Sequence, residues 1–146
     1  AIDVALSGAF GIDLAVDKAT PEGRAQLAEG VRLYKENLRK LVMHGELYRL
    51  VSPYEHPLAA LSYVAKDKTE AVVYLYQTMD GKVSSVRLDG LEADRTYSLR
   101  EINLPEGAVS RFTSEIRTGK EWMEKGVANP LEKQFESAVL ELKMID

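Results

Sequence analysis

Few side chains in this sequence have a type and spacing suited to chemistry, and histidine is considered first because it serves both as a base and as a metal ligand. The two histidines, His44 and His56, stand twelve positions apart, and each has an acidic residue close by, Glu46 and Glu55. A zinc or iron centre needs three or four converging ligands, so this pair alone does not predict a metal site. We expect His44 at a helix end instead, where its cationic form interacts favourably with the helix carbonyls.

The glycine-rich stretch near the N-terminus contains part of a nucleophile motif. Ser7-Gly8 resembles half of the Gly-X-Ser-X-Gly elbow of hydrolases, but Ala5 stands where the first glycine belongs, and no signal places a histidine nearby. Gly8 and Gly11 do not complete a dinucleotide-binding loop, and the sequence has no Walker-type loop. These glycines therefore indicate the end of a short strand.

Carboxylates are plentiful, but no two are marked as a catalytic pair. A glycosidase needs two carboxyl groups that face each other about 5–9.5 Å apart. The only acids among the first twenty residues are Asp3, Asp13 and Asp17, and they flank expected turns and caps, where solvated or capping roles are usual. The residue patterns thus mark no catalytic residue, no cofactor-binding residue and no metal ligand in this chain, although the number of carboxylates leaves an acid/base pair open.

Aromatic side chains leave a binding function open. Tyrosine occurs 7 times and Trp122 is the single tryptophan, and aromatic faces commonly stack on sugar rings. Tyr74 and Tyr76 fit a second interpretation better, because tyrosine is enriched in strands and these two would then be core residues. A carbohydrate-binding or interaction β-sandwich module that acts on its own is therefore the alternative function.

Composition and length narrow the class of protein. The chain has 146 residues, 45% of them apolar and none of them cysteine, enough for a core without metals or disulfides. It is too short for a whole α/β barrel of roughly 250 residues. Its 19 basic and 23 acidic side chains give a net charge of -4, which argues against a nucleic-acid partner. No apolar run approaches the ~18 residues of a membrane span. Because the chain starts with Ala1 and lacks a signal-peptide pattern, we expect a trimmed piece of a longer protein.

The first third of the chain predicts a short strand followed by one long helix. Apolar residues alternate over the first six positions, as in a strand: Ile2, Val4 and Leu6. Thr20 is a good N-cap before Pro21, and Gly45 is a typical helix stop, so the helix should span about Pro21 to His44. Its apolar stripe has the helical period: Leu27, Val31, Tyr34, Leu38 and Leu41.

After Gly45 the pattern changes to the two-residue period of strands. Strands are expected over 47–51, 58–65, 70–78, 95–100 and 137–144, with a less regular one between 108 and 116. Asp67-Lys68 should join the second and third strands, and Asp80-Gly81 should form a type I′ hairpin turn between 74–79 and 82–88. Residues 118–125 have the pattern of a helical turn capped by Thr118. About 7–8 short strands predict a mainly β fold (α+β overall), an antiparallel Greek-key-like β-sandwich preceded by one long amphipathic helix.

The strand around Val72 indicates where the centre of the sheet lies. Its two faces are both apolar: Ala71, Val73 and Leu75 point one way, and Val72, Tyr74 and Tyr76 point the other. A strand of this kind is central and covered on both sides. We expect a second sheet over one face, and the N-terminal helix or a partner outside this chain over the other.

The segment that follows the helix reads Gly45-Glu46-Leu47-Tyr48-Arg49-Leu50-Val51-Ser52-Pro53-Tyr54-Glu55. It resembles the junction between helix and sandwich in bacterial α-galactosidases of glycoside hydrolase family 36. Other stretches resemble that family in the same order along the chain: 7–14, 21–44, 64–73, 88–97, 118–127 and 137–143. Two places depart from the family pattern, because Glu46 stands for the usual aspartate and His56-Pro57 replaces a typical glycine with an asparagine or aspartate.

The resemblance implies a domain organisation and a function. Residues 1–45 would be a remnant of the catalytic barrel, its last strand and final helix, and residues 46–146 the C-terminal antiparallel β-sandwich. The family's nucleophile and acid/base are aspartates on earlier barrel strands, so no position here inherits a catalytic role. The implied function is a non-catalytic C-terminal domain of an α-galactosidase-like glycoside hydrolase. It would pack against and stabilise a barrel that hydrolyses terminal α-galactosides with retention, and the fragment alone should be inactive.

The resemblance also implies partners. The main partner would be the missing catalytic barrel, with a galactoside bound only through that barrel, and any signal peptide would precede this fragment, so the compartment is not assigned. A barrel strand without its neighbours has unpaired edges that invite pairing with another chain. We therefore expect the first ~16 residues either to fold back on the sandwich or to form a homo-oligomer.

Overall fold

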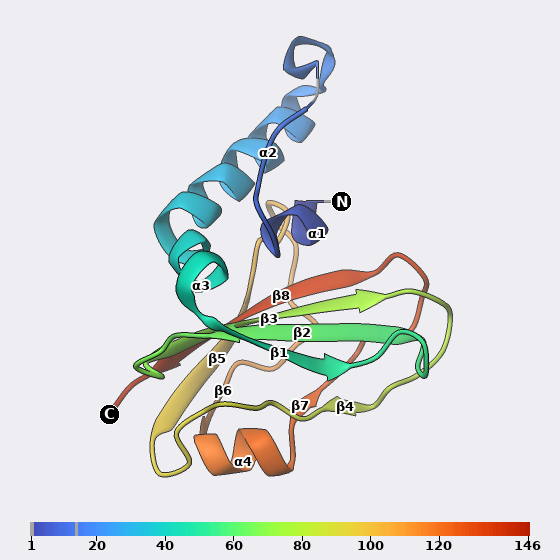
Figure 1. Ribbon diagram of the computed structural model, residues 1–146. Helices are drawn as coiled ribbons and strands as arrows, with labels where there is room; N and C mark the ends of the chain where they lie inside the picture. Colours follow the sequence, from blue (N-terminus) through green and yellow to red (C-terminus); the bar gives the residue numbers. More distant parts are fainter. Residues whose placement is uncertain (1, 14) are drawn as a thin grey trace.

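The first part of the protein is helical and the rest is a β-sandwich, as a computed structural model shows for residues 2–13 and 15–146 (Figure 1). The helical elements are α1 (Ile2–Leu6), η1 (Val16–Lys18), α2 (Pro21–Leu33), η2 (Tyr34–Leu38), α3 (Arg39–His44) and α4 (Gly119–Glu124). The strands are β1 (Glu46–Val51), β2 (Leu58–Val64), β3 (Glu70–Gln77), β4 (Ser85–Val86), β5 (Thr96–Ile102), β6 (Glu115–Thr118), β7 (Val127–Ala128) and β8 (Ser137–Met144). Among the described residues, no helix combines the length and the apolar character needed to cross a bilayer.

Six strands form one sheet in the order β1-β2-β3-β8-β5-β6, and every neighbouring pair is antiparallel. β4 and β7 pair with each other and, together with α4, form the second layer below this sheet (Figure 1). The 8 antiparallel strands and the long helical stretch confirm the predicted mainly β sandwich. The strands expected over 47–51, 58–65, 70–78, 95–100 and 137–144 correspond to β1, β2, β3, β5 and β8.

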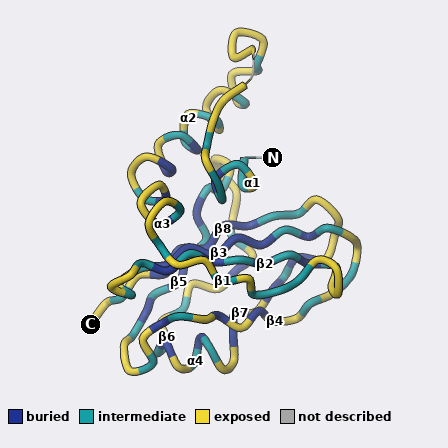
Figure 2. The backbone as a smooth tube through the Cα atoms, viewed as in Figure 1, coloured by how far each residue is buried: buried dark blue, intermediate teal, exposed yellow. Residues whose placement is uncertain are grey.

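β3 is central and buried on both faces, as predicted (Figure 2). We call the face over the second layer the inner face; it carries Val73 and packs against residues such as Leu88, Trp122 and Leu131. We call the opposite face the outer face, and the helices cover it. The outer core consists of Leu6, Tyr34, Leu38, Leu41, Val72, Tyr74, Ile102 and Val139. The cover over the outer face is therefore the N-terminal helical layer of this same chain.

The predicted helix over Pro21–His44 is confirmed as a continuous helical stretch formed by α2, η2 and α3. It begins where the Gly23 N–H donates to the Thr20 hydroxyl at 3.1 Å. Its middle turn, η2, is a π-helix, which a regular period of apolar residues does not reveal. It ends at Gly45, where a Cβ atom would lie 2.5 Å from the Leu41 carbonyl oxygen, so a residue with a side chain does not fit there.

The strand predicted from Ile2, Val4 and Leu6 is wrong, because these residues form helix α1. Leu6 is fully buried whereas Val4 is 58% exposed, which is the pattern of a helix with positions 2 and 6 on its inward side. Over so short a stretch, apolar residues two positions apart do not distinguish the two periods. Residues 2–6 pack on the outer face of the sandwich, whereas most of the described residues from Ala9 to Lys18 are exposed.

The hairpin predicted at Asp80-Gly81 is also wrong. A type I′ turn needs positive φ at both central residues, but only Gly81 has it, with φ 149°. β3 pairs with β2 and β8, and the chain after Gly81 crosses to the second layer, where Val86 enters the inner core. The Gly81 N–H donates to the Glu132 carbonyl at 2.9 Å, so a distant loop, not the next strand, holds this turn.

Of the smaller predictions for the second half of the chain, the turn at Asp67-Lys68 and the cap at Thr118 are confirmed, and one strand is wrong. Lys68 adopts φ 59° in the predicted turn between β2 and β3, and Thr118 caps α4 through a complete capping box with Glu121. The strand expected between 108 and 116 is wrong over most of its length, since β6 begins only at Glu115. The residues before it instead form an exposed loop with a single strongly buried anchor, Phe112.

Candidate functional site

The residues considered for metal binding do not come together. His44 ends α3 and His56 follows β1, so the strand between them separates the two by about 20 Å of extended chain. Both imidazoles are exposed. Over residues 2–13 and 15–146, no group of three or more His, Cys, Asp or Glu side chains is placed to hold a metal ion.

The residues considered for nucleophilic or acid/base chemistry make structural contacts. The Ser7 hydroxyl donates to the Val4 carbonyl at 2.8 Å, as at many helix ends. The two oxygens of Asp3 each accept one hydrogen bond at 2.6 Å, from Asn103 Nδ2 and from Ser137 Oγ. Asp13 and Asp17 are exposed. Asp3 is therefore held by structural hydrogen bonds, and Asp13 and Asp17 lie on the surface.

The aromatic residues considered for sugar stacking are core residues. Trp122 is 1% exposed, its Nε1–H donates to the Tyr97 carbonyl at 3.3 Å, and the Arg117 guanidinium lies 5.0 Å from its ring centre. Tyr74 is 0% exposed. Tyr76 is partly buried, and this burial raises the pKa of its hydroxyl to about 12. Trp122 and Tyr74 are thus buried and Tyr76 partly so, while Tyr54 is 97% exposed, and the carbohydrate-binding alternative is not favoured.

The helical layer presents the surface that stands out as available for a partner. The first half of α2 projects beyond the sheet, whereas η2 and α3 lie close to it (Figure 1). Of the predicted apolar stripe, Tyr34, Leu38 and Leu41 are buried in the outer core. Leu27 and Val31 are only partly buried, so the stripe continues past the sandwich.

Two grooves of about 530 Å³ each run beside the helical stretch, the first along its projecting half and the second from the end of α2 along η2 and α3. The first lies between α2 and the loop after β5; Ile2, Asp3, Leu27, Asn103, Pro105 and Ser137 are among its lining residues. The second lies between α2 and the segment after α1; it is lined by Phe10, Ile12, Val31, Tyr34 and Met43, with Lys35 and Arg39 at its rim. Both grooves are lined by apolar and polar side chains together.

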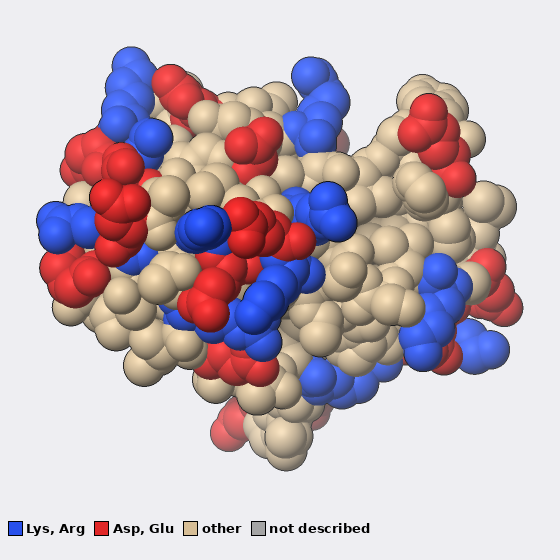
Figure 3. Space-filling view, turned by 90° about the horizontal axis from the view of Figure 1, so that it is seen from below, with Lys and Arg blue, Asp and Glu red and all other residues tan. Residues whose placement is uncertain are grey.

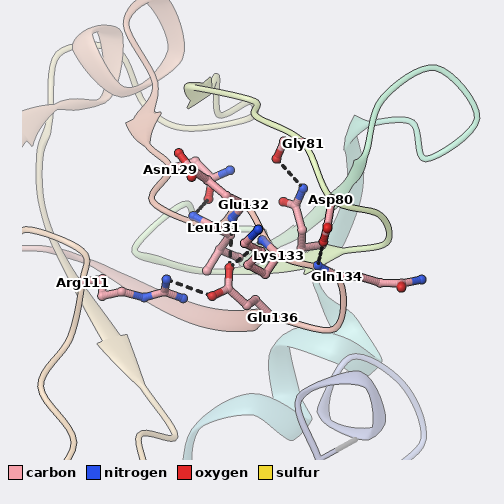
Figure 4. Close-up of polar contacts among 10 residues, drawn as sticks. Asp80, Gly81, Arg111, Asn129, Leu131, Glu132, Lys133, Gln134 and Glu136 are labelled. Carbon is pink, nitrogen blue, oxygen red and sulfur yellow. Dashed lines mark hydrogen bonds and ion pairs between the residues drawn. The ribbon is translucent and has the colours of Figure 1, made fainter.

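The opposite end of the sandwich carries a polar network that organises loops (Figure 4). The Glu136 carboxylate accepts the N–H groups of Glu132 and Lys133 at 2.9 and 3.0 Å and pairs with Arg111, and the two backbone bonds hold its pKa below the usual value. Asp80 Oδ1 accepts the Gln134 N–H at 2.9 Å. These bonds connect the 78–81 turn to the 129–136 loop, so the network fixes the conformation of these two loops.

Acidic and basic side chains alternate over the face seen in Figure 3, without a continuous patch of either sign. This distribution agrees with the small net charge of -4. An electrostatic surface for a nucleic acid requires clustered Lys and Arg, and the face shown in Figure 3 does not have that character.

Sequence reasoning missed the way in which the sheet holds α1. Asp3 was expected only as a turn or cap residue, yet its carboxylate reaches Asn103 and Ser137, which follow it by 100 and 134 positions. The available signal was the clustering of tyrosines on the outer face, since Tyr74 and Tyr76 are two positions apart on β3 and Tyr63 lies on the neighbouring strand. Tyrosine hydroxyls buried on one face need hydrogen-bond partners, and no such partner had been predicted for these three hydroxyls.

Comparisons with known proteins agree with the architecture. A family model described as "Glycosyl hydrolase family 36 C-terminal domain" matches residues 58–142. Alpha-galactosidase AgaA of Geobacillus stearothermophilus is 32% identical over 97% of this chain, which corresponds to 18% of that protein. Alpha-galactosidase C of Emericella nidulans is 32% identical over 64% of this chain and 12% of its own length.

Solved structures give the same result over nearly the whole chain. The crystal structure of the GH36 alpha-galactosidase AgaB from Geobacillus stearothermophilus superposes with a TM-score of 0.83 at 32% identity, and covers 99% of this chain and 19% of that one. The alpha-galactosidase from Lactobacillus brevis has a TM-score of 0.79 at 22% identity. The chain thus spans about a fifth of the length of the relatives it matches.

Proposed function

This chain belongs to the glycosyl hydrolase family 36 C-terminal domain family, and on that premise we propose that it braces the catalytic barrel of an α-galactosidase. The barrel would hydrolyse terminal α-galactosides with retention and would carry every group that contacts the sugar. The proposal is supported by the relatives, which are named alpha-galactosidases and are about five times as long as this chain.

The observation that carries the proposal is that the sandwich buries only half of the apolar stripe of the helical stretch. The second half of the helical stretch buries Tyr34, Leu38 and Leu41 in the outer core, whereas Leu27 and Val31 of the first half face the two grooves. A helix with one continuous apolar stripe needs cover along its whole length. We assign the cover of the first half to the catalytic barrel.

We further propose that residues 1–45 belong with the barrel and residues 46–146 form the sandwich domain. Gly45 is the natural boundary because the helix ends there and β1 starts at the next residue. In this arrangement no catalytic residue, cofactor-binding residue or metal ligand lies on the chain. The helical layer would then contact both domains. It would pack on the sandwich through the outer core and on the barrel through the two grooves.

Two measurements test the proposal. The purified chain should not hydrolyse an aryl α-galactoside, and turnover by the chain alone would overturn the assignment of catalysis to the barrel. In a second experiment, this chain replaces the matching last fifth of the Geobacillus stearothermophilus enzyme AgaA. The chimera should be active and more heat-resistant than the truncated enzyme that lacks this part.

Point variants of the chimera locate the docking surface. Val31→Asp should lower its heat resistance, because it places a charged carboxylate on the apolar stripe that the barrel would cover. Ile116→Asp is the matched control, since Ile116 is 63% exposed on the edge strand β6 and lines neither groove. Equal effects of the two substitutions, or no effect of Val31→Asp, would contradict docking of the barrel on α2.

A further inference from the structure

Helix α1 is only five residues long, and side chains of the sandwich tie it to the sheet. Three tyrosine hydroxyls on the outer face donate to its backbone carbonyls: Tyr63 to Ser7 at 2.9 Å, Tyr74 to Leu6 at 2.9 Å and Tyr76 to Asp3 at 3.1 Å. The carbonyls of Val4 and Ala5 accept the next N–H groups along the chain, from Ser7 and Gly8. Every carbonyl from Asp3 to Ser7 therefore has a donor. An isolated helix of five residues is unstable in water, so the tyrosines supply what the helix lacks.

The side chains of α1 are fixed at the same place. The Asp3 carboxylate accepts hydrogen bonds from Asn103 and Ser137, at 2.6 Å each. Leu6 is 0% exposed in the outer core. A Cβ atom added at Gly30 would lie only 2.9 Å from Ile2 Cγ2, so α1 lies tightly against α2. Five donors of the sandwich thus converge on one short segment.

The chain immediately after this segment is held far less. Gly8 and Gly11 have nothing within 4 Å of where a Cβ atom would lie. Ala9, residues 11–13 and residues 15–18 are exposed, and Phe10 is only partly buried. A segment with a few strong contacts beside an exposed connection opens as a local unit at a cost below that of global unfolding.

We propose that residues 2–7 are a latch that opens while the sandwich stays folded, and that the five donors on the sandwich are its catch. Opening the latch also removes one wall of the first groove, because Ile2 and Asp3 line it. The latch can be tested on this chain alone. Its consequence for a partner rests on the proposed docking function: the barrel would find the first groove complete only when the latch is closed.

Hydrogen exchange in the 146-residue chain measures the opening. The amides of Ser7 and Gly8 report on the latch through their bonds to Val4 and Ala5, at 3.2 and 3.3 Å, and amides within β3 report on the sandwich. In the wild type, the two groups should exchange with different dependence on urea concentration, with the latch almost insensitive to urea.

Tyr63→Phe and Tyr76→Phe each remove one catch bond and keep the ring. Each should speed exchange at Ser7 and Gly8 about fivefold, the effect expected from losing one buried hydrogen bond, with β3 unchanged. Asp3→Ala removes two bonds to a carboxylate and should speed exchange by more than tenfold. The matched controls are Tyr54→Phe and Asp13→Ala, since Tyr54 is 97% exposed and Asp13 is exposed.

Two results would overturn the latch. One is exchange at Ser7 and Gly8 that follows urea as steeply as exchange within β3, which would mean that the segment opens only on global unfolding. The other is equal acceleration of latch and β3 amides in Tyr63→Phe and Tyr76→Phe, which would make the tyrosines ordinary core residues. Failure of the latch leaves the AgaA chimera experiment unaffected, and failure of barrel docking leaves the exchange experiment unaffected.

Discussion

Val72 and Val73 allow a direct test of whether the helical layer is part of the protein's core. They are neighbours on β3 and point to opposite faces of the sheet. Val72 is 0% and Val73 is 1% exposed. The test is to compare Val72→Ala with Val73→Ala, with Val109→Ala on an exposed loop as the matched control.

The expected magnitude follows from the burial. Each substitution removes two fully buried carbons, which costs about 1.6 kcal/mol at ~0.8 kcal/mol per carbon. The void left in a packed site adds about 1 kcal/mol, so each variant should lose about 2.5 kcal/mol. For a chain of this length, that loss lowers the melting temperature by about 5–10 °C. The exposed control Val109→Ala should change stability by less than about 0.5 kcal/mol.

Urea unfolding followed by circular dichroism measures the free energy of unfolding of the three variants and the wild type. If the helices and the outer face form one cooperative unit with the sandwich, Val72→Ala and Val73→Ala lose stability equally and keep the wild-type dependence on urea. A loss in Val73→Ala alone, with Val72→Ala close to the control, would refute the reasoning. The helical layer would then be a loose cover, and it would not provide a firm platform for a partner.

Three further predictions concern local features. Thr118→Ala removes the capping box of α4 and should lower the free energy of unfolding by about 1 kcal/mol, whereas exposed Thr113→Ala should not change it. Gly126→Ala and Gly107→Ala both force a side chain to positive φ, but only at position 126 would the Cβ atom meet a neighbour, the Val86 oxygen at 2.4 Å. In thermal melts Gly126→Ala should therefore lose more stability than Gly107→Ala. Burial raises the pKa of Tyr76 to about 12, so the native state keeps a proton that the unfolded chain releases near pH 10. Stability measured in urea should therefore fall as the pH rises from about 10 to 12, and less so in Tyr76→Phe.

Elements with their own local signals could be predicted from the sequence. Thr20 and Pro21 start the helical stretch and Gly45 ends it, because capping, the fixed φ of proline and the lack of room for a Cβ atom act within a few residues. The two apolar faces around Val72 located the central strand for a similar reason, since burial on both sides needs only the alternation along one strand. These signals do not depend on distant parts of the chain.

Features set by distant contacts could not be predicted in this way. The helical conformation of α1 depends on donors that follow it by 56 to 134 positions, the first of them Tyr63 and the last Ser137. The turn at Gly81 depends on the Glu132 carbonyl, which tertiary structure alone brings close. In both cases the local pattern was compatible with two conformations. Hydrogen bonds to residues far along the chain selected one of them.

The length of the helical stretch supports the proposed docking of a partner on α2. Residues 21–44 span about 36 Å at 1.5 Å per residue, and the part that enters the outer core lies between Tyr34 and Leu41. About half of the helix therefore extends beyond what the sheet covers, and its apolar stripe continues there with Leu27 and Val31. A stripe that served only the sandwich would end with the sheet. The apolar residues of α2 beyond the sheet therefore support the proposal that the partner of this domain docks on α2.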